Sequence, residues 1–116
     1  MKNDENMLDD LKIYKESYDF FFWLWPLINK FPKSEKYVLG EKLKCSFLIF
    51  FENIIAYNYN YQRQESLNKA NIELEKIRIF MRLAKDLNLI NFNKYEIASR
   101  KINEIGKLLG GLLKTT

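Results

Sequence analysis

The sequence contains no histidine and a single cysteine among its 116 residues. Without histidine the chain has no imidazole base, no Ser-His or Cys-His nucleophile pair, and no Glu-x-x-His metal pair of the kind found in helical bundles. A lone thiol excludes an intramolecular disulfide framework and leaves no ordinary zinc site, so we expect Cys45 to be half-buried and unreactive. Neighbouring acids such as Glu73 and Glu75 diverge on a helix, which gives carboxylate catalysis little support. These absences argue against an enzyme, a bound metal and any other cofactor.

Glycine and proline are also scarce, with four and two residues. Hydrophobic residues make up 47% and aromatic residues 16%, which is too apolar for disorder and too poor in turn residues for a many-stranded β fold. The longest apolar run covers only residues 20–28, well short of the ~20 residues that cross a bilayer, and an acidic segment precedes it. The sequence therefore predicts one all-α domain in a reducing cytoplasm, with no membrane segment.

Charge is distributed unevenly along the chain. The net charge is +4, but residues 1–20 hold six acids and three lysines, so residues 21–116 carry 16 basic and nine acidic side chains, or +7. A basic body of this kind permits contact with nucleic acid or with an acidic protein, and it is also compatible with a role in solubility alone.

Apolar residues recur three and four positions apart in four segments, which predicts helices over residues 7–30, 34–58, 66–88 and 93–113. Short links between such helices favour an antiparallel up-down four-helix bundle over residues 7–114, after a flexible acidic leader at residues 1–6. The four expected core stripes are Met7, Leu11, Tyr14, Tyr18, Phe21, Trp25 and Ile28; Tyr37, Gly40, Leu43, Phe47, Phe50, Ile54 and Tyr57; Leu67, Ala70, Leu74, Ile77, Met81 and Ala84; and Tyr95, Ala98, Ile102, Ile105, Leu109 and Leu112.

Capping residues predict where these helices begin and end. Ser34 and Ser66 are candidate N-caps for the second and third helices. Asn93 with Glu96 fits a capping box for the fourth helix. Asn88 tolerates a left-handed conformation and is the expected end of the third helix.

Glycine and proline inside the predicted helices require separate explanations. Pro26 removes one backbone hydrogen bond, so we expect a kink in the first helix. Gly40 lies on a buried stripe, either because another backbone comes close or because the first turns tolerate a glycine. The Gly106-x-x-x-Gly110 spacing either lets helices approach closely or weakens the last turn.

The chain has more apolar surface than one bundle core requires. Consecutive aromatic residues at 20–23 and apolar residues at 47–51 point around the whole circumference of their helices, and the third helix has a second apolar stripe. Such surfaces favour a homo-oligomer, although kinks and unequal helix lengths could also bury them within one chain. The expected oligomer interface contains Phe20, Phe22, Trp23, Phe51, Ile72, Ile79 and Leu83.

Basic side chains form stripes on the last two helices. Arg78, Arg82 and Lys85 fall within about 60° of one another on the third helix. On the fourth helix, Arg100, Lys107 and Lys114 repeat every seven residues. These stripes are either a nucleic-acid surface, concentrated by oligomerisation, or a solvated surface with pairs such as Glu96–Arg100 and Glu104–Lys107.

Three stretches together resemble the accessory variability determinant (Avd) family of diversity-generating retroelements. They are KFPKSEKYVLGEKL at residues 30–43, NKANIELEKIRIFMRLAKDLNLI at residues 68–90 and YEIASRKINEIGKLLGGLLK at residues 95–114. The resemblance covers nearly the whole chain from about Tyr18, and the combination of RLAKDL with IGKLLGG is its most specific part. The chain differs in having Lys36 and Lys42 where arginine is common, which would weaken bidentate phosphate contacts.

The resemblance implies a ring-like homopentamer with a basic surface, and a non-enzymatic partner of the retroelement's reverse transcriptase. Such proteins bind RNA or DNA and support copying of the template RNA into mutagenised cDNA. Carried onto this chain, the basic positions are Arg78, Arg82, Lys85, Arg100 and Lys107. The corner FPKSEKYVLG also resembles four-helix proteins encoded in 23S rRNA intervening sequences, which have no reverse transcriptase partner. A structural helical oligomer without nucleic-acid affinity is the third alternative.

Overall fold

The computed structural model describes residues 11–116, so the expected acidic leader and the expected helix start at Met7 lie outside the described residues. Four long helices account for most of the described chain, and residues 11–116 contain no β-strand. The all-α prediction of four long helices is therefore confirmed. The elements in order are α2 Lys12–Asn29, α3 Lys33–Glu35, the π-helix η1 Lys36–Gly40, α4 Glu41–Asn58, α5 Arg63–Asp86 and α6 Phe92–Lys114.

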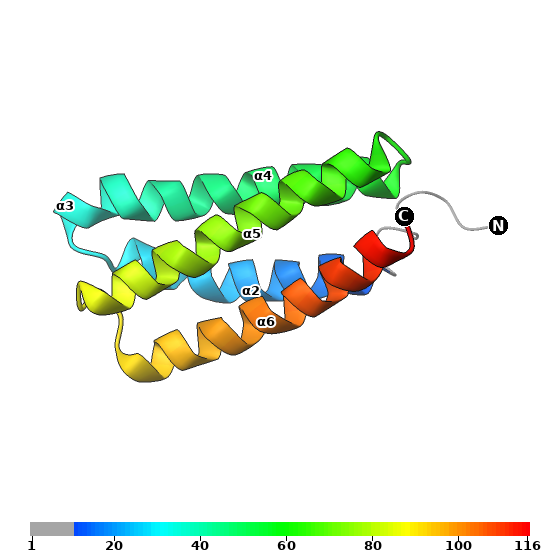
Figure 1. Ribbon diagram of the computed structural model, residues 1–116. Coiled ribbons are helices and arrows are strands. Elements are labelled where there is room, and N and C mark those ends of the chain that lie inside the picture. Colours follow the sequence, from blue (N-terminus) through cyan, green and yellow to red (C-terminus); the bar gives the residue numbers. More distant parts are fainter. Residues whose placement is uncertain (1–10) are drawn as a thin grey trace.

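The helices pack in a closed sequence of neighbours: α2 on α4, α4 on α5, α5 on α6 and α6 on α2. The described chain measures 47 × 23 × 22 Å, as expected for a bundle of long rods. Figure 1 shows the α2–α3 and α5–α6 connections at one end of the bundle, and the α4–α5 connection and the C-terminus at the other end. Among these four neighbouring pairs, α4–α5 makes the most extensive contact and α2–α4 the smallest.

The first helix buries a different stripe from the one expected. The expected stripe through Tyr14, Tyr18 and Trp25 is wrong, because these side chains are half-buried or exposed. The two stripes are offset by about 100° around the helix and share only Ile28, and the mainly aliphatic one turns toward the core. Phe20 is 1% exposed, so it belongs to the core and not to an oligomer interface. The buried residues of α2 are Ile13, Ser17, Phe20, Leu24 and Ile28.

The large rings of α2 fill the space toward α4. Phe21 lies parallel to Phe47 with ring centroids 4.3 Å apart, and it also packs against Phe51 at 5.8 Å. Tyr14 meets Phe51 edge to face at 6.2 Å. Bulky rings between the two helices account for the small contact between their backbones. The helix continues through Pro26 to Asn29, where Lys30 caps it, so the expected end near Lys30 is confirmed.

The second long helix contains a π-turn before Gly40. A Cβ atom at Gly40 would lie 3.0 Å from Ile28 Cγ2, so a close approach explains this glycine, although the neighbour is a side chain and not a backbone. The π-turn adds one residue to a helical turn and rotates the positions before it. For that reason Leu39 is buried while Tyr37, expected on the stripe, is exposed. The remaining stripe residues of α4 are buried as predicted.

The buried stripes of α5 and α6 match those predicted from the sequence, but the two helices do not begin at the predicted residues. Every stripe residue expected on α5 is buried, and on α6 only the outermost two are partly exposed. Ser66 is not an N-cap: α5 starts at Arg63, and the Ser66 hydroxyl donates to the Tyr61 carbonyl at 3.0 Å. Asn91 caps α6 in place of Asn93, since its side chain accepts from the Lys94 amide at 2.8 Å.

At two further helix ends, one predicted cap is wrong and one predicted left-handed residue is confirmed. Ser34 is also not an N-cap, because Pro32 occupies that position and the helix begins at Lys33. At the end of α5, Asn88 adopts φ 61° as expected. The Leu89 amide donates to the Ala84 carbonyl and the Asn88 amide to the Lys85 carbonyl, which together form a Schellman motif.

Candidate nucleic-acid interface

Arg78 links α5 to α6 and is not a free cation. Its Nη1 donates to Asn103 Oδ1 at 2.5 Å, and its Nε lies 3.4 Å from Glu75 Oε2. A Cβ atom at Gly106 would lie 3.6 Å from Arg78 Nη2, so this glycine leaves ordinary room for the guanidinium against α6. The guanidinium therefore helps to join two helices, and its replacement would disturb packing as well as charge.

Lys85 is also held within the chain. Its Nζ lies 3.4 Å from Asp86 Oδ1 and 4.7 Å from the centroid of the Tyr95 ring. The cation–π contact joins the last turn of α5 to the first turn of α6. Part of the positive charge of Lys85 is thus already compensated.

Arg82, Arg100 and Lys107 are the predicted binding residues that remain exposed. The expected pairs Glu96–Arg100 and Glu104–Lys107 are not among the ion pairs formed by residues 11–116. Arg82 stands on α5 between Arg78 and Lys85, one helical turn from each. Of the five predicted binding residues, three are therefore exposed cations, and two are held by contacts within the chain.

The five predicted residues do not form one cluster. Arg78 and Lys85 contact the side of α6 that packs on α5. Lys107 instead lines a pocket with Lys12 and Glu16 of α2 and with Glu104 of α6. The structure therefore spreads the basic side chains over two sides of α6.

Two lysines that the sequence analysis did not select are held over tryptophan rings. Lys44 Nζ of α4 lies 4.1 Å from the Trp25 ring centroid and donates to Asn29 Oδ1 at 2.6 Å. Lys94 Nζ of α6 lies 5.8 Å from the Trp23 ring centroid. Nineteen positions separate Lys44 from Trp25, and helical periodicity cannot connect residues so far apart on different helices.

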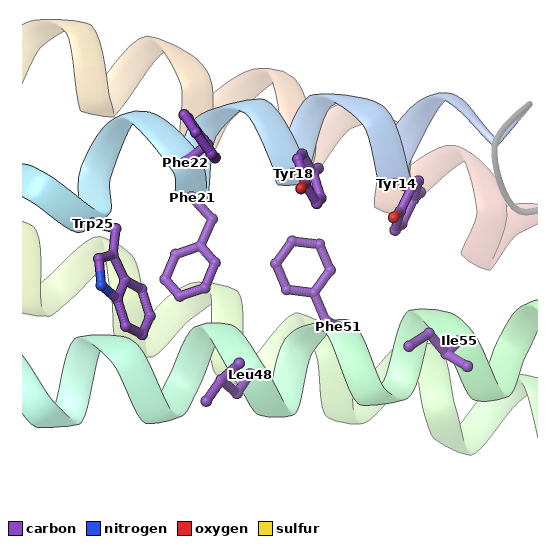
Figure 2. A pocket seen from close by; sticks show the side chains of 8 residues that line it. All are labelled: Tyr14, Tyr18, Phe21, Phe22, Trp25, Leu48, Phe51 and Ile55. Atoms are coloured by element: carbon purple, nitrogen blue, oxygen red, sulfur yellow. The ribbon is translucent and has the colours of Figure 1, made fainter.

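An apolar groove runs between α2 and α4. Figure 2 shows Phe21 and Phe51 between the two helices, with Trp25 near one end of the groove and Tyr14 near the other. The groove has a volume of about 400 Å³, and both Phe22 and Phe51 of the expected oligomer interface line it. The eight lining residues are Tyr14, Tyr18, Phe21, Phe22, Trp25, Leu48, Phe51 and Ile55.

The second apolar stripe of α5 lies on the surface of the chain. Ile72 and Ile79 are 56% and 58% exposed, and Leu83 lines a further groove against Val38 of η1. Trp23 differs from these side chains because it is half-buried beside Phe20. Cys45 is exposed, which corrects the expectation of a half-buried thiol.

Residues 11–116 contain neither a membrane-spanning helix nor a cluster of metal-ligating side chains. No helix within residues 11–116 combines the length and apolar character needed to cross a bilayer. Within the same residues, no three histidine, cysteine or acidic side chains lie close enough together to hold a metal ion.

Comparison with known proteins places the chain in a family. No curated protein and no solved structure matches it. A family model described as bAvd-like matches residues 11–116, which include all the helices of the structure. This is the family whose motifs the three sequence stretches resemble. The chain therefore belongs to the bAvd-like family.

Proposed function

We propose that the protein is a non-enzymatic accessory protein of a diversity-generating retroelement, which binds the element's reverse transcriptase and template RNA to support mutagenic cDNA synthesis. The observation that carries this proposal is the family match over residues 11–116. Because the match covers the entire described fold, the proposal does not depend on a single short motif.

The proposed active form is a ring-like homopentamer of antiparallel up-down bundles, the subunit number following from the family resemblance. The apolar side chains outside the core support self-association, because large exposed apolar patches mark interaction sites. They lie on two surfaces, which are the groove between α2 and α4 and the second apolar stripe of α5. The residues proposed for the interface are Phe22, Trp23, Phe51, Ile72, Ile79 and Leu83.

The proposed binding to nucleic acid depends on exposed cations. Arg82, Arg100 and Lys107 make no ion pair with any carboxylate in residues 11–116, so their charge is available to phosphates. A closed ring would repeat each cation around its axis and concentrate the positive potential.

RNA binding measured by fluorescence anisotropy at several salt concentrations tests the nucleic-acid contact. We expect affinity to fall steeply with salt, and Arg82→Gln with Arg100→Gln to reduce the log–log slope by roughly 1.4, since each single-strand phosphate contact contributes about 0.7. Arg78 is left unchanged because it joins α5 to α6. The matched control is Lys69→Gln with Lys76→Gln, whose cations are already paired with Glu65 and Glu73. A flat salt response in the unmodified protein would contradict the proposal.

Co-purification with the reverse transcriptase of a diversity-generating retroelement tests the protein partner. The proposal expects a stable complex that survives size-exclusion chromatography. Failure to co-purify, with RNA binding retained, would favour the intervening-sequence type of four-helix protein. Absence of both activities near physiological salt would leave a structural helical oligomer.

A further inference from the structure

Lysines from two helices are positioned by tryptophan rings at one end of the bundle. Lys44 is fixed from two directions, by the Trp25 ring at 4.1 Å and by the neutral Asn29 amide oxygen at 2.6 Å. Lys94 lies over the Trp23 ring of the same helix α2. Within residues 11–116, neither ammonium group has a carboxylate partner within 4.0 Å. Rings that hold a lysine limit its motion without neutralising its charge, so both charges remain available to an anion.

The turn beside these residues adds further positive charge. Residues 30–43 contain four lysines and two glutamates, a balance of 4 − 2 = +2. Lys30 and Lys33 flank the α2–α3 turn and are exposed. Of the two acids, Glu35 accepts a hydrogen bond from the Ser34 hydroxyl and Glu41 is exposed.

Acids from the neighbouring helices offset only part of this charge. Asp86 lies at the end of α5, where it pairs with Lys85. Glu96 is exposed and lies in the first turns of α6. Lys85 and Asp86 offset each other, so of these acids only Glu96 reduces the charge of the surrounding lysines, and the local balance stays positive.

Exposed aromatic rings occur at the same end. Phe92 is the first residue of α6 and is 64% exposed, and Tyr37 of η1 is 58% exposed because the π-turn rotates it away from the core. Trp25 is 36% exposed and lies at the end of the apolar groove that is nearer the C-terminus of α2 (Figure 2). Tyr37 and Phe92 lie outside the proposed oligomer interface, whereas Trp25 also lines the groove between α2 and α4. Figure 1 shows that the α2–α3 and α5–α6 connections lie at this same end of the bundle.

We infer that this end of the bundle, formed by Lys30, Lys33, Lys44 and Lys94 with Trp25, Tyr37 and Phe92, binds an unpaired stretch of nucleic acid. The inference rests on the proposed function and adds binding residues other than Arg82 and Arg100. Bases of a single strand stack on exposed rings while lysines neutralise the phosphates, which is the combination that single-strand-binding surfaces use. A paired duplex hides the faces of its bases, so this lysine–aromatic end discriminates in favour of unpaired RNA.

Two RNA probes and a pair of ring substitutions test the inference. The probes are an oligouridine of about 15 nucleotides and a fully paired RNA hairpin, the former matching the usual site size of such surfaces. We expect Tyr37→Ala with Phe92→Ala to weaken oligouridine binding at least about tenfold, because stacked bases are lost. Hairpin binding should change less than about twofold, since paired bases do not stack on these rings.

The chain offers a matched control for these substitutions at the opposite end of the bundle. Tyr59 and Tyr61 are 49% and 63% exposed, and they lie in the α4–α5 connection. Tyr59→Ala with Tyr61→Ala should therefore leave the affinity for oligouridine unchanged. Equal effects of the two variants, or equal loss of hairpin and oligouridine binding, would overturn the inference.

Tryptophan fluorescence gives a second readout that does not depend on substituting the rings. The sequence has two tryptophans, so Trp23→Phe leaves Trp25 as the only reporter. Stacking of a base on Trp25 should quench its emission saturably with oligouridine, and the hairpin should quench it much less. No difference between the two RNA probes would count against stacking.

The outcomes separate this inference from the proposed function. If the unmodified protein binds neither RNA, both fail together. If Arg82→Gln with Arg100→Gln weakens binding while the ring variants bind oligouridine normally, only the lysine–aromatic end is wrong. Ring variants that change oligomer size but not RNA affinity would also overturn the inference, because they would assign these rings to a contact between chains.

Discussion

Glycine has only a hydrogen atom as its side chain, and at Gly40 this permits the contact between η1 and α2. Gly40 ends the π-turn directly beside Ile28, and an added Cβ atom would lie 3.0 Å from Ile28 Cγ2. Ile28 is fully buried, so it has little freedom to move away. At most other places in a helix, glycine only lowers helix stability.

Substitution of Gly40 tests this contact. Gly40→Ala gains about 1 kcal/mol of helix propensity, but overpacking against Ile28 costs about 1–3 kcal/mol. We expect a net decrease in the free energy of unfolding, measured by chemical denaturation.

Gly110 is the matched control, because an added Cβ atom there would meet nothing within 4 Å of the same chain. Gly110→Ala should raise the free energy of unfolding by about 0.5–1 kcal/mol. Stabilisation by both substitutions would show that Ile28 does not restrict Gly40. Dissociation of an oligomer by Gly110→Ala would instead indicate close helix approach between chains.

Helix ends depend on the position of one side chain relative to a backbone amide. The sequence predicted Asn93 as the cap of α6. The structure selects Asn91, whose side chain accepts from the Lys94 amide, so Asn93 lies within the first helical turn. Because the cap is Asn91 and not Asn93, α6 is longer at the end where Lys94 contacts Trp23.

Paired substitutions distinguish the two asparagines. Asn91→Ala should lower the free energy of unfolding by about 1 kcal/mol, because one backbone amide of α6 loses its partner. Asn93→Ala should have little effect, since its side chain is exposed and alanine favours the helix. Thermal unfolding monitored by circular dichroism measures both changes. The opposite ranking would place the cap at Asn93.

At the scale of the whole molecule, the core of one chain leaves much apolar surface uncovered. The groove is formed by α2 and α4, whereas the second apolar stripe belongs to α5. A monomer with two such surfaces would be prone to aggregate. In the proposed ring, association between copies would cover both surfaces, because a contact between unlike surfaces forms a ring when its rotation closes.

Light scattering tests whether the chain associates. We expect the unmodified protein to have a mass several times that of one chain, and Ile79→Glu with Leu83→Glu to reduce it to a single chain. Both side chains are largely exposed in the single chain, so its melting temperature should change little once association is lost.

The control for this experiment is Tyr61→Glu with Asn93→Glu, which adds the same charge at exposed positions outside the proposed interface. It should leave the oligomer intact. An unmodified protein that stays a single chain at high concentration would contradict the proposed ring.

Sequence periodicity predicted much of the fold but less of the candidate site. The basic stripes on α5 and α6 were visible in the sequence, yet the role of Arg78 depends on Asn103, which lies 25 positions away on another helix. Similarly, Lys44 and Lys94 gain their significance only from the rings of α2. Partners on different helices have no fixed spacing in the sequence, so no pattern could reveal them.

The sequence by itself determined the helical class, the number of long helices and the buried stripes of α4, α5 and α6, because apolar residues at three- and four-residue spacing can face one core only as helices. Tertiary structure decided which side of α2 is buried. With apolar residues around the whole helix, periodicity leaves several stripes equally good, and packing against α6 and the rings of α4 selects one of them. Tertiary structure also decided the π-turn that ends at Gly40, since Gly40 packs closely against Ile28 of another helix.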